Sequence, residues 1–215
     1  MDLYLVRHGA TAANERHVYQ PPTEPISAIG AAEVTRLVRH IQELTPTHIY
    51  TSEFKRARET AHYFGYATGL EPEWLPDLHE IRAPEQMFGR SHYGLASFQY
   101  QLRWFFGLYT PAPGSKAETK EAFVHRVLRT RAHFEAHHAP EDRVVAVTHS
   151  IFINFFVAHL CQDAHISLFQ AVPLLLKIFA YENSGITHLR YDHNEAREAC
   201  RWQVVSYNDH AHLSV

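Results

Sequence analysis

Basic side chains follow three apolar stretches of the chain at the points where those stretches end. Arg7 and His8 follow LYLV, Arg56 comes shortly after HIYTS, and His149 closes RVVAVTH. Guanidinium groups and imidazoles are N–H donors of fixed geometry, which suits the binding of a multiply charged oxyanion. Phosphate is the obvious oxyanion for this set, and an unprotonated imidazole can also act as a nucleophile.

These basic residues meet only if the apolar stretches are neighbouring strands of one parallel sheet. Residues 3–6, 48–50 and 143–147 are short, apolar and stopped by polar or glycine residues, as buried strands are. Ligands bind beyond the carboxyl ends of such strands. The two arginines and two histidines are therefore expected to line one crevice.

Helices are expected between these strands. In the first connection, apolar residues recur at spacings of three and four up to about Leu44, and Ser27 is a suitable N-cap. The second strand leads into Thr51 and Ser52, which we expect to cap a helix that runs to about residue 66. Ser115 and Glu118 have the spacing of a capping box that opens a long helix to about His138.

The last part of the chain predicts further strands, at 174–181, 186–191 and 201–206, with a hairpin turn at 183–185. The alternation of strands and helices predicts an α/β fold, a three-layer α/β/α sandwich whose mostly parallel sheet includes one antiparallel strand. A chain of 215 residues that is 46% hydrophobic is long enough for one domain, 1–215, with a sizeable core.

Composition argues against several classes of function. The 20 Lys and Arg against 23 Asp and Glu give a net charge of -3 without blocks of like charge, so no nucleic-acid partner is expected. No apolar stretch is long enough for a membrane span. Cys161 and Cys200 lie in no CxxC motif, which favours free thiols and a cytoplasmic location. The 18 histidines include no HExxH motif or zinc-type array, so neither a metal nor a cofactor is expected.

An aromatic segment at about 84–114 interrupts this pattern. It carries many Phe, Tyr and Trp residues without a strand period and ends in PAPG. It is expected to be a helical insertion, or lid, over one edge of the sheet. Its aromatic residues fit two roles equally well: packing, on the sheet edge or on a second copy in a homodimer, and a pocket for an apolar or aromatic leaving group.

Five motifs together resemble the histidine phosphatase superfamily, also called phosphoglycerate mutase-like. The resemblance spans nearly the whole chain in the order of the family and favours its phosphatase branch. The motifs are LVRHGATAAN (5–14), SEFKRARETA (52–61), LHE (78–80), VTHS (147–150) and YNDHAHL (207–213).

The resemblance implies a role for each matching residue. His8 matches the nucleophile that becomes a phosphohistidine, and Gly9 is expected to make a tight turn close against the ligand. Arg7, Arg56 and His149 match the residues that hold the phosphoryl oxygens during catalysis, a clamp that acts most strongly in the transition state.

Further positions complete the candidate site. Asn14 matches another phosphate contact, and Glu80 matches the proton donor for the leaving group, with Glu85 as its rival. Many relatives carry Arg-x-Gln-Gly after the Asn, whereas this chain has VYQP (18–21), so that Gln20 alone is retained as a contact. Ser150 stands where relatives often have Gly, and its hydroxyl could cap the next helix or touch the phosphate.

The function expected from the resemblance is a phosphomonoester phosphatase that needs no metal and acts on a small phosphorylated metabolite. GRSHYGL (89–95) resembles a loop of the cofactor-dependent mutases, but Arg90 stands where those enzymes have Glu. This argues against glycerate phosphates and for a larger or less acidic leaving group. The alternatives are a phosphoglycerate-type mutase and a phosphate-binding or protein-interaction module with little catalysis.

Overall fold

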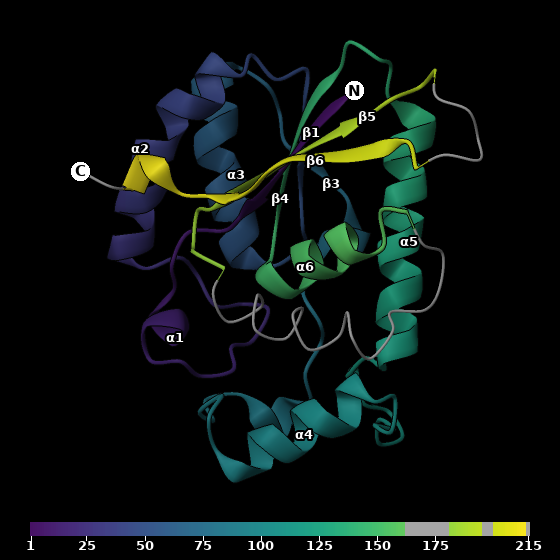
Figure 1. The fold of residues 1–215 in the computed structure, drawn as a ribbon. Coiled ribbons are helices and arrows are strands. Elements are labelled where there is room, and N and C mark those ends of the chain that lie inside the picture. The colour runs from purple at the N-terminus through teal and green to yellow at the C-terminus, as the bar shows by residue number, and fades with distance from the viewer. Residues whose placement is uncertain (162–180, 195–199, 214–215) are drawn as a thin grey trace.

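The computed structural model describes residues 1–161, 181–194 and 200–213, and in them a six-stranded sheet has the order β3-β2-β4-β1-β5-β6 (Figure 1). Strands β3, β2, β4 and β1 are parallel, and β5 is antiparallel to both of its neighbours. The predicted sheet, mostly parallel with one antiparallel strand, is confirmed. The strands are β1 Asp2–Arg7, β2 His48–Thr51, β3 Glu73–Trp74, β4 Arg143–Thr148, β5 Ile186–Tyr191 and β6 Trp202–Asp209.

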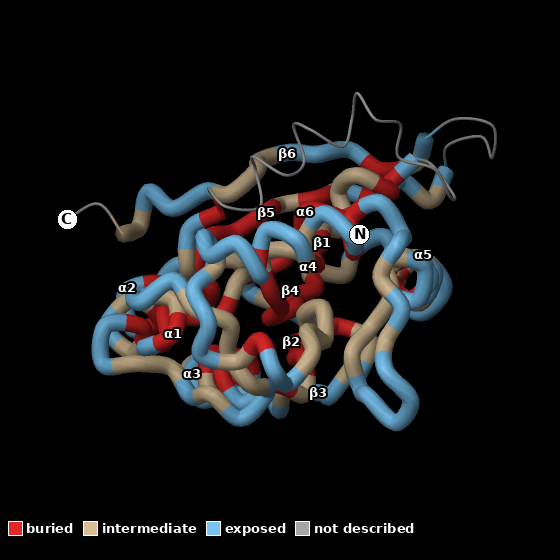
Figure 2. Tube along the Cα trace, turned by 90° about the horizontal axis from the view of Figure 1, so that it is seen from below, coloured by how far each residue is buried: buried red, intermediate tan, exposed pale blue. Residues whose placement is uncertain are grey.

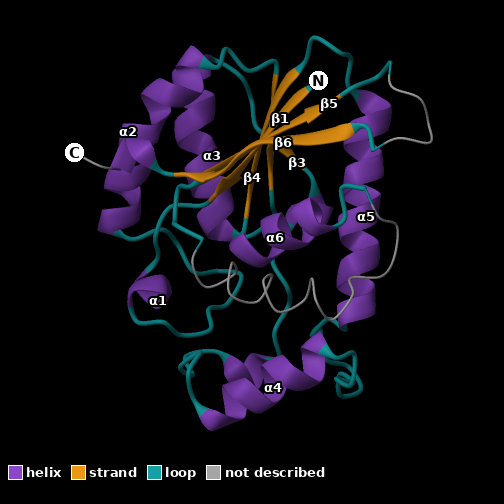
Figure 3. Ribbon diagram, viewed as in Figure 1, coloured by secondary structure: helices purple, strands orange, loops and turns teal. Residues whose placement is uncertain are grey.

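Helices cover both faces of the sheet, which confirms the three-layer sandwich (Figure 3). Helices α2 and α3 pack on one face, and α5 and α6 pack on the other. The helices are α1 Ala12–Glu15, α2 Ala28–Glu43, α3 Lys55–Thr68, α4 Leu95–Phe105, α5 Lys120–His137 and α6 Ser150–Ala158, and 3-10 turns lie at Pro76–Leu78, Glu85–Met87 and Ala211–Leu213.

The core lies on both sides of the central strands (Figure 2). Side chains alternate between the two faces of a strand, so Leu3 and Leu5 of β1 pack with α5 and α6, whereas Val6 packs with α2 and α3. Residues 144–147 of β4 have no exposed surface. This burial on both faces explains why β4 is apolar at every position rather than at every second one.

The start of α3 differs from the prediction. Ser27 caps α2 as expected by accepting a hydrogen bond from Gly30 N, but α3 begins at Lys55 rather than directly after Thr51 and Ser52. Phe54 occupies the N-cap position without a side-chain hydrogen bond. Ser52 is used elsewhere, because its hydroxyl bonds to His149.

The predicted capping box at the start of α5 is also wrong. Thr119 is the N-cap, and its hydroxyl accepts a hydrogen bond from Ala122 N at 3.1 Å. Glu118 forms a buried, two-point ion pair with Arg126, at 3.0 and 2.7 Å. A buried arginine requires such a partner, and this non-local demand outweighed the local capping pattern.

The aromatic segment is a helical insertion, as expected, with α4 set apart from the sheet (Figure 3). Two isolated β-bridges, Tyr19 to Phe88 and Val18 to Ser91, attach it to the loop after α1. Trp104 and Phe105 are buried in the main core. The strand predicted at 174–181 lies outside the described residues except for residue 181. The first arm of the hairpin predicted around 183–185 lies outside them with it. No described helix is both long and apolar enough to cross a membrane.

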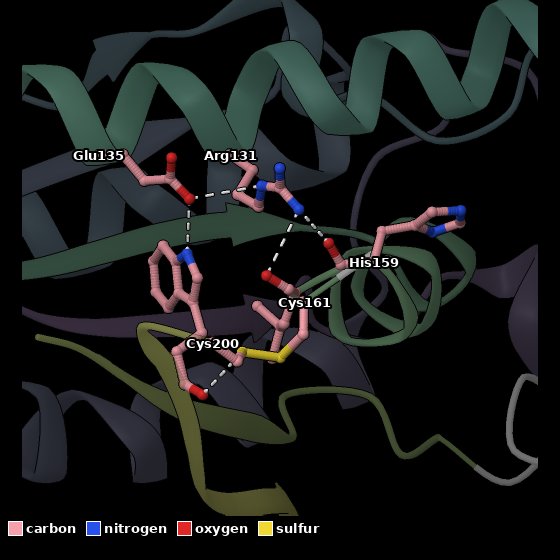
Figure 4. Close-up of a disulfide and its surroundings, with 7 residues drawn as sticks. Arg131, Glu135, His159, Cys161 and Cys200 are labelled. Atoms are coloured by element: carbon pink, nitrogen blue, oxygen red, sulfur yellow. Dashed lines mark hydrogen bonds and ion pairs between the residues drawn. A yellow bond between two sulfur atoms is a disulfide. The ribbon is translucent and has the colours of Figure 1, made fainter. Parts of the chain in front are cut away.

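The expectation of two free thiols is wrong, because Cys161 and Cys200 form a disulfide. Figure 4 shows the bond beside Arg131 and Glu135 of α5. It joins the chain just after α6 to the chain just before β6. The partners are 39 residues apart, so no local motif could reveal the pairing. Free thiols therefore no longer support the predicted cytoplasmic location.

Candidate active site

A cavity of about 410 Å³ lies beyond the carboxyl ends of the central strands. Strands β1 and β4 pair in parallel with Arg7 opposite Thr148, so the next residues, His8 and His149, emerge side by side. Their rings are 5.0 Å apart. Arg7, His8, Arg56 and Glu80 line the cavity, and His149 is fully buried behind it.

The ring of His8 is held in one tautomer. Its Nδ1 lies 2.8 Å from Gly9 O, and its Nε2 lies 3.1 Å from Arg56 Nε. Because an arginine Nε can only donate, His8 Nε2 must accept, and the ring proton is on Nδ1. Burial, and then the nearby charges of Arg56 and Arg7, hold the pKa of His8 well below its usual value. The ring is therefore neutral, with a lone pair on Nε2.

Gly9 is required by a close approach to α2 that the sequence did not predict. A Cβ at this position would lie 2.7 Å from both Gly30 O and Val34 Cγ2 of α2. The backbone after β1 thus passes too close to α2 for any side chain. The expected approach of Gly9 to a ligand stays a prediction.

The two arginines carry charge into the cavity. Burial lowers the pKa of Arg56 to about 10, so its guanidinium stays charged at neutral pH. It donates from Nη1 to Pro21 O at 3.2 Å and lies over the ring of Phe54. Arg7 donates to Tyr181 O, and its buried Nε has no hydrogen-bond partner. Among the described residues, neither guanidinium forms an ion pair with a carboxylate, so both can bind an anion.

His149 is bonded through one ring nitrogen. Its Nε2 lies 2.8 Å from Ser52 Oγ, which itself accepts a hydrogen bond from Phe54 N. Burial, and then the charge of Arg56, hold the pKa of His149 well below its usual value, so the ring is neutral. Its Nδ1 is buried and, among the described residues, has no hydrogen-bond partner.

Glu80 is held by the start of α6. Its Oε2 accepts from Ile151 N at 3.0 Å, and its Oε1 accepts from Phe152 N at 3.2 Å and from Ile81 N at 3.1 Å. Burial raises the pKa of Glu80, while these N–H groups and the charges of Arg56 and Arg7 limit the rise. The rival, Glu85, is exposed on a 3-10 turn and does not line this cavity.

The other predicted contacts also lie at the cavity, which is lined by Asn14, Gln20 and Ser150. Thr11 Oγ1 lies 2.9 Å from Asn14 Oδ1 and 2.8 Å from Gln20 Oε1. Thr11 N also donates to Asn14 Oδ1 at 3.2 Å, so the amide N–H groups of Asn14 are left to donate to a ligand. Thr11 was not among the predicted site residues, although the spacing of Thr11 and Asn14 is that of the capping box they form at α1.

Comparison with known proteins identifies the family of this chain. A family model described as histidine phosphatase superfamily, branch 1, matches residues 3–210. The chain belongs to this superfamily. Over 82 residues it is 34% identical to a probable phosphoglycerate mutase, GpmB, of Escherichia fergusonii, a match covering 38% of each chain.

Solved structures share the histidine phosphatase fold along nearly the whole chain. A phosphoserine phosphatase mutant of Entamoeba histolytica has a TM-score of 0.76 at 19% identity and 99% and 98% coverage of this chain and that one. A mycobacterial glucosyl-3-phosphoglycerate phosphatase has 0.73 at 22% identity and 96% and 98% coverage. A putative alpha-ribazole-5'-P phosphatase of Escherichia coli K-12 has 0.74 at 20% identity and 98% coverage of both chains.

The cavity of this superfamily member also has an aromatic wall. Tyr19 packs against His92 in a tilted arrangement with ring centres 4.3 Å apart, and its hydroxyl accepts from Gln101 Nε2 at 3.0 Å. Tyr100 and Trp104 of α4 continue this wall. The aromatic segment therefore both packs in the core and lines the cavity, which joins the two roles left open by the sequence.

Proposed function

We propose that this histidine phosphatase hydrolyses phosphomonoesters through a phosphohistidine at His8, without a metal ion. The observation that carries the proposal is the neutral His8 ring, whose Nε2 accepts a hydrogen bond from Arg56 Nε at 3.1 Å in a cavity lined by two arginines. Neither arginine forms an ion pair with a described carboxylate, so the pair supports a phosphate clamp beside a nucleophilic nitrogen.

In the first step, the Arg56 Nε–H group turns from His8 Nε2 to a phosphoryl oxygen, which frees the Nε2 lone pair. His8 Nε2 then attacks phosphorus, and the bond from phosphorus to the ester oxygen breaks. Arg7, Arg56 and His149 hold the three equatorial oxygens, on which charge spreads in the transition state. Glu80 gives its proton to the departing alkoxide. Burial raises the pKa of Glu80, and a bound phosphate dianion would raise it further, which supports this role as the acid.

In the second step, water attacks the phosphohistidine. Glu80, now a carboxylate, removes a proton from the water as the new oxygen–phosphorus bond forms. The nitrogen–phosphorus bond breaks, the electron pair returns to His8 Nε2, and inorganic phosphate leaves. Each proton and electron pair is accounted for without a metal, so the cycle restores the starting enzyme.

We expect the enzyme to release inorganic phosphate from monoesters at an unchanged rate after treatment with EDTA. The first measurement is phosphate release from a panel of phosphorylated metabolites. The second is the stability of the phosphoenzyme, which a phosphohistidine should lose in acid and keep in base. Exchange of the phosphoryl group between substrate isomers without release of phosphate would favour the mutase, which the partial match to GpmB keeps as the second candidate. Loss of turnover in EDTA that is restored by a divalent cation would contradict the metal-free cycle.

The aromatic wall supports a leaving group that is apolar or aromatic. A phosphoryl group fills only a small part of a cavity of about 410 Å³, so the remainder is available to the alcohol. We expect Tyr19→Ala to raise the KM for an aryl phosphate about tenfold, because an aromatic ring that lines the cavity is lost. Inhibition by inorganic phosphate should stay nearly unchanged.

The matched control for this variant is Tyr66→Ala, because Tyr66 is 91% exposed on α3, away from the cavity. It should keep the wild-type KM. Steady-state kinetics with aryl phosphates and glycerol phosphate measures the effect. An equal rise of KM for both substrates, or no rise for either, would contradict the leaving-group pocket.

A small-molecule phosphate ester is the partner that this function requires. The homodimer and the absence of a nucleic-acid partner stay predictions.

A further inference from the structure

A second cluster of histidines lies at the edge of the sheet opposite the cavity. His48 opens β2, Asp142 directly precedes β4, and His138 caps the end of α5. Because β2 and β4 are parallel, their amino ends lie together, whereas the cavity lies beyond their carboxyl ends. The six residues of β4 separate the two places by about 20 Å.

The potential ligand atoms of these three residues are close together. One atom from each of His48, His138 and Asp142 lies within 4.8 Å of the others. His138 Nδ1 is 3.4 Å from Asp142 Oδ2. Zinc bonds of about 2.1 Å in a tetrahedron put ligand atoms roughly 3.4 Å apart, so this pair already has the required spacing. His48 supplies the third atom, within 4.8 Å of the other two.

His138 is the observation that points to a ligand. Its side chain has no exposed surface, yet neither ring nitrogen makes a hydrogen bond. The 3.4 Å contact with Asp142 is long for one. Buried polar atoms in folded proteins are almost always partnered, and an ion is one of the partners that explains an exception.

The surrounding groups orient the set in the way that metal ligands are oriented. Thr47 Oγ1 lies 2.9 Å from His48 Nδ1, which leaves Nε2 of that ring for a ligand. The same hydroxyl lies 3.3 Å from Asp142 Oδ1, and Ala139 N donates to Asp142 Oδ2 at 2.9 Å. Such outer contacts fix both the tautomer of a histidine and the plane of a carboxylate.

We propose that His48, His138 and Asp142 bind a divalent transition-metal ion, with water completing the coordination. Two imidazoles and one carboxylate match the ligand preference of Zn²⁺. The ion would tie the end of α5 to the starts of β2 and β4, and it would take no part in the reaction at His8. The ligands lie 90 and 4 residues apart along the chain, a spacing that no short motif describes.

The test is binding of ZnCl₂ to the full chain, followed by calorimetry, and of CoCl₂, followed by its visible absorption. Wild type should bind one tight equivalent of Zn²⁺. His48→Gln and Asp142→Asn should weaken that equivalent at least about tenfold and remove the absorption band of tetrahedral cobalt. His137→Gln is the matched control, because this neighbouring histidine is exposed and lies outside the three-residue set, and it should bind like wild type.

Turnover of an aryl phosphate separates this site from the cavity and also reports folding. His48→Gln and Asp142→Asn should retain wild-type turnover, since neither residue lines the cavity. Equal zinc affinity in wild type and in both variants would overturn the proposal. So would zinc binding that inhibits turnover and is abolished by His8→Ala, because the ion would then occupy the cavity.

Discussion

Turnover of an aryl phosphate by His8→Ala is expected to fall by about 10⁴-fold or more. The imidazole supplies the nitrogen that bonds to phosphorus, and alanine offers no atom for that bond. Steady-state kinetics with EDTA present measures kcat, and an acid-labile phosphoenzyme should be absent from the variant. His8 is buried, so circular dichroism and binding of inorganic phosphate should show that the variant is folded.

His62→Ala is the control for this experiment. His62 is exposed on α3 and does not line the cavity, so its removal should leave turnover unchanged. Imidazole added to the buffer should restore part of the activity of His8→Ala by occupying the space left by the ring. Turnover of the folded variant within tenfold of wild type would exclude His8 as the nucleophile.

Glu80→Gln is expected to slow alkyl phosphates by about 10² to 10⁴-fold and aryl phosphates by less than about tenfold. An alkoxide needs a proton as it departs, whereas an aryl oxide leaves readily without one. The amide keeps the size of the carboxyl group but cannot deliver a proton. The measurement is kcat/KM for a matched pair of alkyl and aryl monoesters.

Glu85→Gln is the matched control, because Glu85 was the rival in the sequence and is exposed outside the cavity. It should behave like wild type with both esters. An equal loss for alkyl and aryl substrates in Glu80→Gln would show that Glu80 is not the acid. A selective loss in Glu85→Gln would move that role to the rival.

The sequence predicted the parts of the fold that depend on local pattern. Arg7, His8 and His149 could be grouped because each directly follows an apolar strand, and the parallel arrangement of these strands brings their ends together. Ser27 could be recognised as a cap because the helix that it starts has a clear apolar period. These signals lie within one turn or one strand of the residues concerned.

The predictions that failed depended on distant partners. Ser52 does not cap α3 because its hydroxyl meets His149, 97 residues further on. Glu118 is held by Arg126, which removed it from the predicted capping box. The sequence around Glu80 could not separate it decisively from Glu85, since the N–H groups that bind its carboxylate belong to α6, about 70 residues away.

The bond between Cys161 and Cys200 has a consequence for the unfolded chain. It closes a loop whose ends are 39 residues apart. The unfolded chain therefore cannot adopt conformations in which those two residues lie far apart, and its conformational entropy is lower. Chain-entropy reasoning assigns such a loop about 4 kcal/mol of unfolding free energy. Cys161 follows the end of α6, and the start of that helix holds the carboxylate of Glu80. The disulfide thus favours the folded state in which α6 binds the carboxylate of Glu80.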